Sequence, residues 1–128
     1  MCWLLFFIEN NECYNENNHE GGRFFMRMEI EDFKSLKQIS MDAGQFNVIV
    51  GSNGSGKSAL LEAIGVLSAA VSGEVSDATL MSRGVRVGTP ALYKSSFRNQ
   101  KIAKTIKFQV ENEQHIRYQV HLANPLEK

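Results

Sequence analysis

Apolar and polar residues alternate along the middle of the chain in the manner of β-strands. In residues 27–33, apolar Met28 and Ile30 alternate with charged Glu29 and Glu31, which is the period of a half-buried strand. A short polar turn through Lys34 and Ser35 leads to a second predicted strand over residues 36–41. Residues 46–50 are rich in β-branched residues and apolar enough to predict a strand that is central in a sheet.

The spacing of apolar residues then changes from two to three and four. Over residues 57–71 they recur on one side of a helix, which predicts an amphipathic α-helix that ends near Gly73. Residues 72–100 follow no period and are expected to be irregular. Residues 104–111 and 115–122 each alternate again, and this predicts an antiparallel β-hairpin at the C-terminal end. The predicted fold class is α/β in the α+β sense, with strands around a glycine loop and one long helix.

The first 25 residues lack such a pattern. An apolar patch is followed by an Asn- and Glu-rich stretch, so residues 1–25 are expected to be a poorly structured leader, or to precede a true start at Met26. The domain is expected over residues 26–128, a length that suits one hydrophobic core. Cys2 and Cys13 have neither disulfide nor zinc spacing. With no membrane-spanning stretch in the sequence, the expected location is the cytoplasm.

Charge is balanced over the whole chain but not along it. The formal net charge at pH 7 is zero, so total charge indicates no partner. Residues 83–107 nevertheless contain seven basic residues and no acid. Two interpretations stay open for this segment, a solvated surface or a contact surface for phosphate or nucleic acid. Its basic residues are Arg83, Arg86, Lys94, Arg98, Lys101, Lys104 and Lys107.

One segment carries a motif with defined chemistry. Residues 51–58 read GSNGSGKS and satisfy the phosphate-loop pattern, with a predicted strand before them and a predicted helix after them. Glycines open backbone conformations that other residues avoid, and they leave the loop's N–H groups free to approach an anion. Lys57 supplies a cation for phosphate stabilisation, and the Ser58 hydroxyl is a hard oxygen ligand suited to Mg²⁺. The predicted nucleotide-binding residues here are Gly51, Ser52, Asn53, Gly54, Ser55, Gly56, Lys57, Ser58 and Ala59.

Residues 26–71 as a whole resemble the opening of ABC-type ATPases related to SMC proteins, RecF-like recombination ATPases and the overcoming-lysogenization-defect (OLD) family. The resemblance rests on the turn Phe33-Lys34-Ser35 between two strands and on the GxNGSGKS loop after a third. It implies the N-terminal lobe of a P-loop ATPase head, with ATP and Mg²⁺ as cofactors and head-to-head dimers. It also implies DNA or a nuclease as a partner, and it places Lys34 and Ser35 near the nucleotide.

A hydrolytic ATPase of this kind also needs an acidic site after the loop. The expected pattern is an Asp that follows an apolar strand, with a Glu beside it to activate water. Asp77 is the one Asp after the loop, and no apolar run precedes it. We therefore expect an incomplete domain that binds ATP and hydrolyses it weakly or not at all by itself. Two alternatives stay open, a small phosphotransferase of the P-loop kinase type and a non-catalytic regulatory or interaction fragment.

Overall fold

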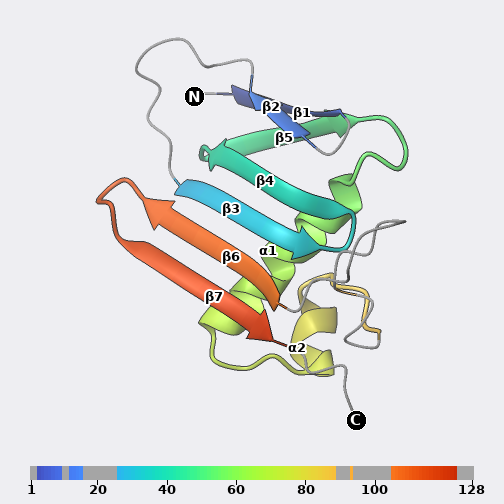
Figure 1. Cartoon of the computed structure of the whole chain (residues 1–128), viewed down its shortest axis with the longest axis vertical. Helices are drawn as coiled ribbons and strands as arrows, with labels where there is room; N and C mark the ends of the chain where they lie inside the picture. Colours follow the sequence, from blue (N-terminus) through green and yellow to red (C-terminus); the bar gives the residue numbers. More distant parts are fainter. Residues whose placement is uncertain (1–2, 10–11, 16–25, 89–92, 94–104, 124–128) are drawn as a thin grey trace.

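A four-stranded antiparallel sheet forms the larger part of the fold (Figure 1). The computed structural model describes residues 3–9, 12–15, 26–88, 93 and 105–123, and side chains from residue 26 onwards. The strands lie in the order β4-β3-β6-β7. Their bounds are Met26–Phe33 for β3, Leu36–Ala43 for β4, Thr105–Asn112 for β6 and Arg117–Ala123 for β7.

Two hairpins and one long-range pairing set the register of this sheet. Phe33 pairs with Leu36 across the turn between β3 and β4, which confirms the predicted turn through Lys34 and Ser35. The hairpin of β6 and β7 confirms the alternation read from the C-terminal region. Strand β6 then joins β3, with Ile30 opposite Phe108. Alternate residues of these strands therefore share one buried face.

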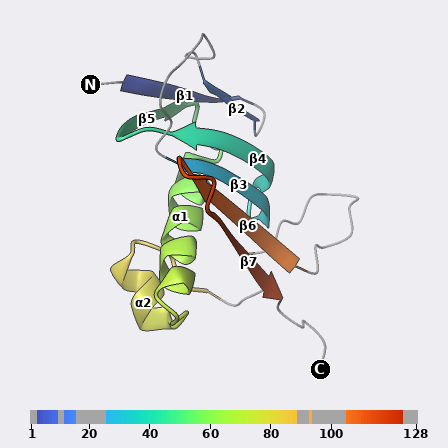
Figure 2. The same cartoon turned by 90° about the vertical axis from the view of Figure 1, so that its left-hand side faces the viewer.

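Helix α1 (Lys57–Val71) covers that face, as Figure 2 shows. Its bounds confirm the predicted amphipathic helix. Leu60, Ala63 and Val66 of α1 belong to the same buried cluster as Ile30 and Phe108 of the sheet. Burial of these apolar side chains supplies the main favourable term for folding. The helix is thereby fixed against the sheet, and its N-terminus stands at the end of the glycine loop.

The N-terminal region differs from the expectation of a leader without regular structure. Strands β1 (Trp3–Glu9) and β2 (Glu12–Asn15) form a three-stranded sheet with β5 (Phe46–Gly51), in the order β2-β1-β5. Strand β1 runs parallel to β5 and antiparallel to β2. The local pattern did not predict these strands because their pairing depends on a strand about forty residues further along. A domain boundary at residue 26 stays a prediction.

The position of β5 is also different from the one predicted. Strand β5 ends the order of its sheet instead of lying at the centre, and Phe46 and Val50 are 48% and 41% exposed. Its β-branched composition reported strand formation correctly. Composition does not show whether a strand has a neighbour on one side or on both sides. The predicted central position of β5 was therefore wrong.

A short helix, α2 (Asp77–Ser82), lies in the segment that was expected to be irregular. Six residues are too few to show a helical period. Ser76 caps the helix by accepting a hydrogen bond from the N–H of Thr79, and the Thr79 hydroxyl receives the N–H of Ser76. The spacing Ser-x-x-Thr was the available signal. In the part of the chain that the structure describes, no helix has the length and apolar character needed to cross a membrane.

Candidate functional site

The glycine loop, residues 51–58, connects the end of β5 to the start of α1. Gly54 and Gly56 adopt left-handed backbone conformations, with φ of +83° and +101°. Residues with a Cβ atom are strained at such angles, so both positions favour glycine. The Ser55 N–H donates to the Ser52 carbonyl over 3.2 Å and closes a tight turn within the loop.

The N-terminus of α1 opens into this loop without a side-chain cap. Gly56 is the N-cap residue and makes no side-chain hydrogen bond, and the first turn contains no acidic residue. The first N–H groups of a helix have no partner within the helix, and they carry the positive end of its dipole. A helix start with these properties binds anions, phosphate above all.

Lys57 bends back over the loop. Its Nζ donates to the carbonyl oxygens of Gly51 and Ser52, over 2.7 Å and 2.6 Å. The ammonium group therefore stands above the same backbone that an anion would approach. The acceptors of these two bonds are neutral carbonyls, so the ammonium group can exchange them for stronger bonds to phosphate oxygens.

Two serines test whether the loop fits a nucleotide with its metal. Ser55 is 9% exposed, and its hydroxyl is a buried polar group without a hydrogen-bond partner among the residues that the structure describes. Such a group lacks a partner that it would normally have, and phosphate can supply one. Ser58 is exposed at the first turn of α1, where a hydroxyl can ligate Mg²⁺. The residues present fit both groups.

Lys34 contacts α1 beyond the loop. Its Nζ pairs with the Glu62 carboxylate, and it stands 5.0 Å from the centre of the Tyr93 ring. The Lys34 N–H donates to the Tyr93 carbonyl over 2.8 Å. Ser35 follows in the same turn and is half-buried. The structure thus brings this turn to the helix that starts at the loop, and a nucleotide contact of Lys34 or Ser35 stays a prediction.

Glu62 is the residue that pattern analysis missed. It lies on the buried face of α1, and its side chain is 5% exposed. Burial alone would raise the pKa of Glu62, but hydrogen bonds and charge from Lys34 and Arg86 outweigh it and lower that pKa. The carboxylate is therefore ionised at neutral pH. An acid on an apolar helix face was the signal in the sequence.

Parallel pairing also brings an acidic residue to the loop's edge of the sheet. Ile8 pairs with Gly51, so Glu9, the last residue of β1, follows at the carboxyl end from which the loop leaves. Ligands of parallel sheets bind outside the carboxyl ends of the strands. The expected place for such an acid was downstream of the loop. The sequence signal for this upstream acid was an apolar run, residues 3–8, that is followed by Glu9.

The predicted basic contact surface is partly described. Arg83 donates to the hydroxyls of Ser68 and Ser72, over 3.1 Å and 2.9 Å, and so joins the end of α2 to α1. Lys107 pairs with Glu31 over 3.0 Å. These two residues have structural partners. Nucleic-acid binding stays a prediction, and four of its residues lie outside the described ones, namely Lys94, Arg98, Lys101 and Lys104.

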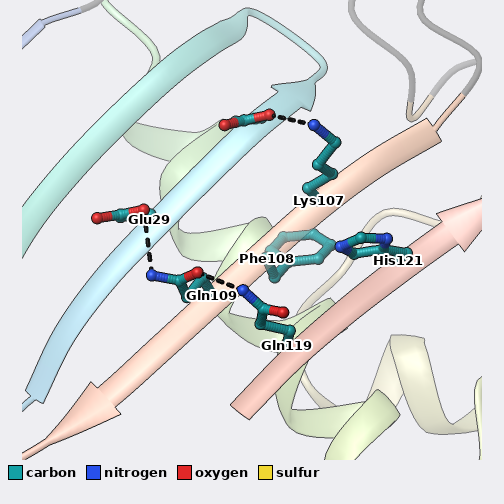
Figure 3. Close-up of a pocket in the computed structure, with 7 residues that line it drawn as sticks. Glu29, Lys107, Phe108, Gln109, Gln119 and His121 are labelled. Carbon is teal, nitrogen blue, oxygen red and sulfur yellow. Dashed lines mark hydrogen bonds and ion pairs between the residues drawn. The ribbon is translucent and has the colours of Figure 1, made fainter. Parts of the chain in front are cut away.

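The outward face of the sheet carries a hollow of about 60 Å³, which Figure 3 shows. Gln109 of β6 donates to Glu29 of β3 over 3.4 Å and accepts a hydrogen bond from Gln119 of β7 (Figure 3). The Lys107 and Glu31 pair lies beside them. These groups satisfy one another, and pockets for ligands of nucleotide size are several times larger. This face does not offer a nucleotide site.

The comparisons with known proteins give a family but no close relative. No curated protein and no solved structure matches the chain. A family model described as an AAA domain matches residues 27–125, which include both the glycine loop and the antiparallel sheet. The chain belongs to this AAA domain family.

Proposed function

We propose that the chain binds ATP with Mg²⁺ through the glycine loop, as the nucleotide-binding lobe of an ATPase in the branch of the SMC, RecF-like and OLD proteins. Membership of the AAA domain family supports ATPase-type nucleotide binding. The single observation that carries the proposal is the uncapped start of α1 at the end of the same loop whose carbonyls bind the Lys57 ammonium group. Unpartnered backbone N–H groups and one ammonium group in the same short loop are the donors that phosphate needs.

In this proposal each part of the loop has one task. The backbone of residues 51–59 binds phosphate oxygens, and Lys57 neutralises part of their charge. The Ser55 hydroxyl gains the partner that it lacks, and Ser58 provides an oxygen ligand for Mg²⁺. Mg²⁺ held there by Ser58 would supply positive charge that offsets the negative charge of the phosphates.

Calorimetric titration with ATP and Mg²⁺ tests the proposal. We expect Lys57→Ala to weaken binding by up to about a hundredfold, because a hydrogen bond to a charged group contributes roughly 1.5–3 kcal/mol. Lys37→Ala is the matched control, since Lys37 pairs with Asp32 on the surface and its loss changes the net charge equally. We expect that control to bind ATP within about twofold of the unchanged chain. Equal ATP binding by both variants would refute the proposal.

We further propose that hydrolysis depends on acidic groups that residues 1–128 do not supply. No acid follows an apolar strand downstream of the loop. Phosphate release by the purified chain should therefore fall far below the turnover of ordinary enzymes, about 1–10³ s⁻¹. Release within that range that disappears in Lys57→Ala would show that the chain hydrolyses ATP by itself. DNA or a nuclease as partner belongs to the same proposal through the resemblance.

A further inference from the structure

The buried carboxylate of Glu62 lies one helical turn from Ser58. Residues four apart on a helix share one face, with about 5–6 Å between their Cβ atoms. Ser58 is exposed in the first turn of α1, whereas Glu62 is buried one turn further along the helix. Groups that bind Glu62 therefore stand next to the loop without belonging to its motif.

Two cations from separate segments meet on this carboxylate. Arg86, which follows α2, donates from Nε to Oε1 of Glu62 over 2.6 Å. Lys34, in the turn between β3 and β4, pairs with the other oxygen, Oε2. Figure 1 shows this turn and the segment after α2 on the same side of the molecule as the start of α1. Two positive charges against one negative charge leave a net charge of +1 beside the loop.

Arg86 presents most of its donors away from Glu62. The guanidinium carries five N–H donors in a planar fork, and its bond to Glu62 uses the one on Nε. Its side chain is 76% exposed, and Glu62 is the acceptor that it meets among the described residues. A planar fork with its terminal nitrogens open fits phosphate oxygens.

The backbone around Arg86 is held in place. The Tyr93 hydroxyl donates to the Arg86 carbonyl and accepts the Gly88 N–H, each over 3.1 Å. The Tyr93 carbonyl in turn accepts the N–H of Lys34. The segment that bears Arg86 is thus tied both to α1 and to the turn between β3 and β4. An ordered arginine loses little further freedom when it binds a ligand.

We propose that Arg86 binds the phosphate chain of the nucleotide in the glycine loop, and that Glu62 is the positioning residue that aims it. The inference rests on the proposed ATP binding. It moves Arg86 from the predicted nucleic-acid surface to the nucleotide site. A guanidinium with Nε on a buried carboxylate and its terminal nitrogens toward solvent can bridge protein and phosphate simultaneously. Lys34 shares the carboxylate and adds charge on the other side.

The test compares Arg86→Ala with Arg117→Ala in the full chain. Arg117 of β7 is a matched control. Its guanidinium also pairs with a glutamate, Glu111 of β6, but this pair lies in the hairpin and not beside α1. We expect Arg86→Ala to weaken binding of Mg²⁺-ATP on the order of tenfold, the loss typical of one charge-assisted hydrogen bond at an exposed site. Arg117→Ala should stay within about twofold of the unchanged chain. Arg86→Lys should recover only part of the loss, because an ammonium group lacks the fork.

A second probe locates the contact on the ligand. Inorganic tripolyphosphate, in competition with ATP, should lose affinity for Arg86→Ala by the same factor as ATP does. A loss for ATP alone would place Arg86 at the base or ribose and overturn the proposal. So would unchanged ATP binding with weaker DNA retention at low salt, which would return Arg86 to a nucleic-acid surface. If the unchanged chain binds no ATP, or if Lys57→Ala binds it as well as Lys37→Ala does, the proposed function itself fails, and neither result depends on Arg86.

Discussion

Gly65 of α1 lies against the segment that carries Arg86, and its replacement by Ala tests how tightly that segment is packed. A Cβ atom at Gly65 would stand 2.6 Å from Cγ2 of Val85 and 3.0 Å from the Arg83 carbonyl oxygen. The Val85 methyl group can turn aside, but the carbonyl belongs to the backbone. Hydrogen bonds from Gly84 to Met81 and from Val85 to Leu80 hold that backbone, each over 3.0 Å. The helix and the segment must therefore move apart.

Two opposed effects decide the sign. Ala is favoured over Gly inside a helix by about 1 kcal/mol. Overpacking of a filled core typically costs 1–3 kcal/mol. With one backbone atom at 3.0 Å and one side-chain atom at 2.6 Å, we take about 2 kcal/mol for the contact, which leaves a net loss of about 1 kcal/mol. For a chain of this size the melting temperature should fall by about 4 °C.

Urea unfolding followed by circular dichroism measures this change. Val71→Ala is the control, since Val71 is the last residue of α1 and 60% exposed, and we expect a change within about 0.5 kcal/mol. The double variant Gly65→Ala with Val85→Ala removes the nearest atom. Its loss should be smaller than the sum of the two single losses by at least about 0.5 kcal/mol. A gain of about 1 kcal/mol in Gly65→Ala would mean that helix propensity prevails and that the packing argument is wrong.

Two further predictions concern Glu62 and Ser76. Because the folded pKa of Glu62 lies below its ordinary value of 4.5, its contribution to stability is present above pH 4.5 and is lost as the pH falls through the folded pKa. Glu62→Gln should therefore cost about 1–2 kcal/mol at pH 7 and progressively less below pH 4.5, as measured by urea unfolding at each pH, and a gap that does not shrink would contradict the charge pairing. Ser76→Ala should lower stability by about 1 kcal/mol through loss of the α2 cap, whereas Ser76→Asp should retain it, and equal stabilities would refute that role.

The elements that the sequence predicted show a pattern or composition within their own residues, as do strands β3, β4 and β5. Helix α1 and the hairpin of β6 and β7 each show their pattern over seven or more residues, so they were found with nearly the observed bounds. Strand β1 was missed because it forms a strand by pairing with β5, which lies far from it in the sequence. The six residues of α2 were too few for a period, although the capping spacing at Ser76 was present.

In the candidate site, too, the local part could be predicted from the sequence and the part built from long-range contacts could not. The glycine loop is a local motif, because each of its residues acts through backbone that it carries itself. Glu62 pairs with Lys34, which precedes it by 28 positions in the sequence, and with Arg86, which follows it by 24 positions. No local pattern marks such a contact, and a single acid on an apolar helix face was its only trace. Pairing between β3 and β6 sets the sheet against which both flanking segments pack.

The conformation of Lys34 is consistent with a functional role for this arrangement. Lys34 has φ of +49° in a two-residue hairpin turn, where glycine or asparagine is usually found. Such a conformation costs a lysine about 1 kcal/mol or more, so other contacts must hold it. The ion pair to Glu62 and the hydrogen bond to Tyr93 do so. A glycine would have avoided the strain, but it would have removed the cation beside Arg86. The turn therefore retains a strained lysine, which places a second positive charge on Glu62 beside Arg86.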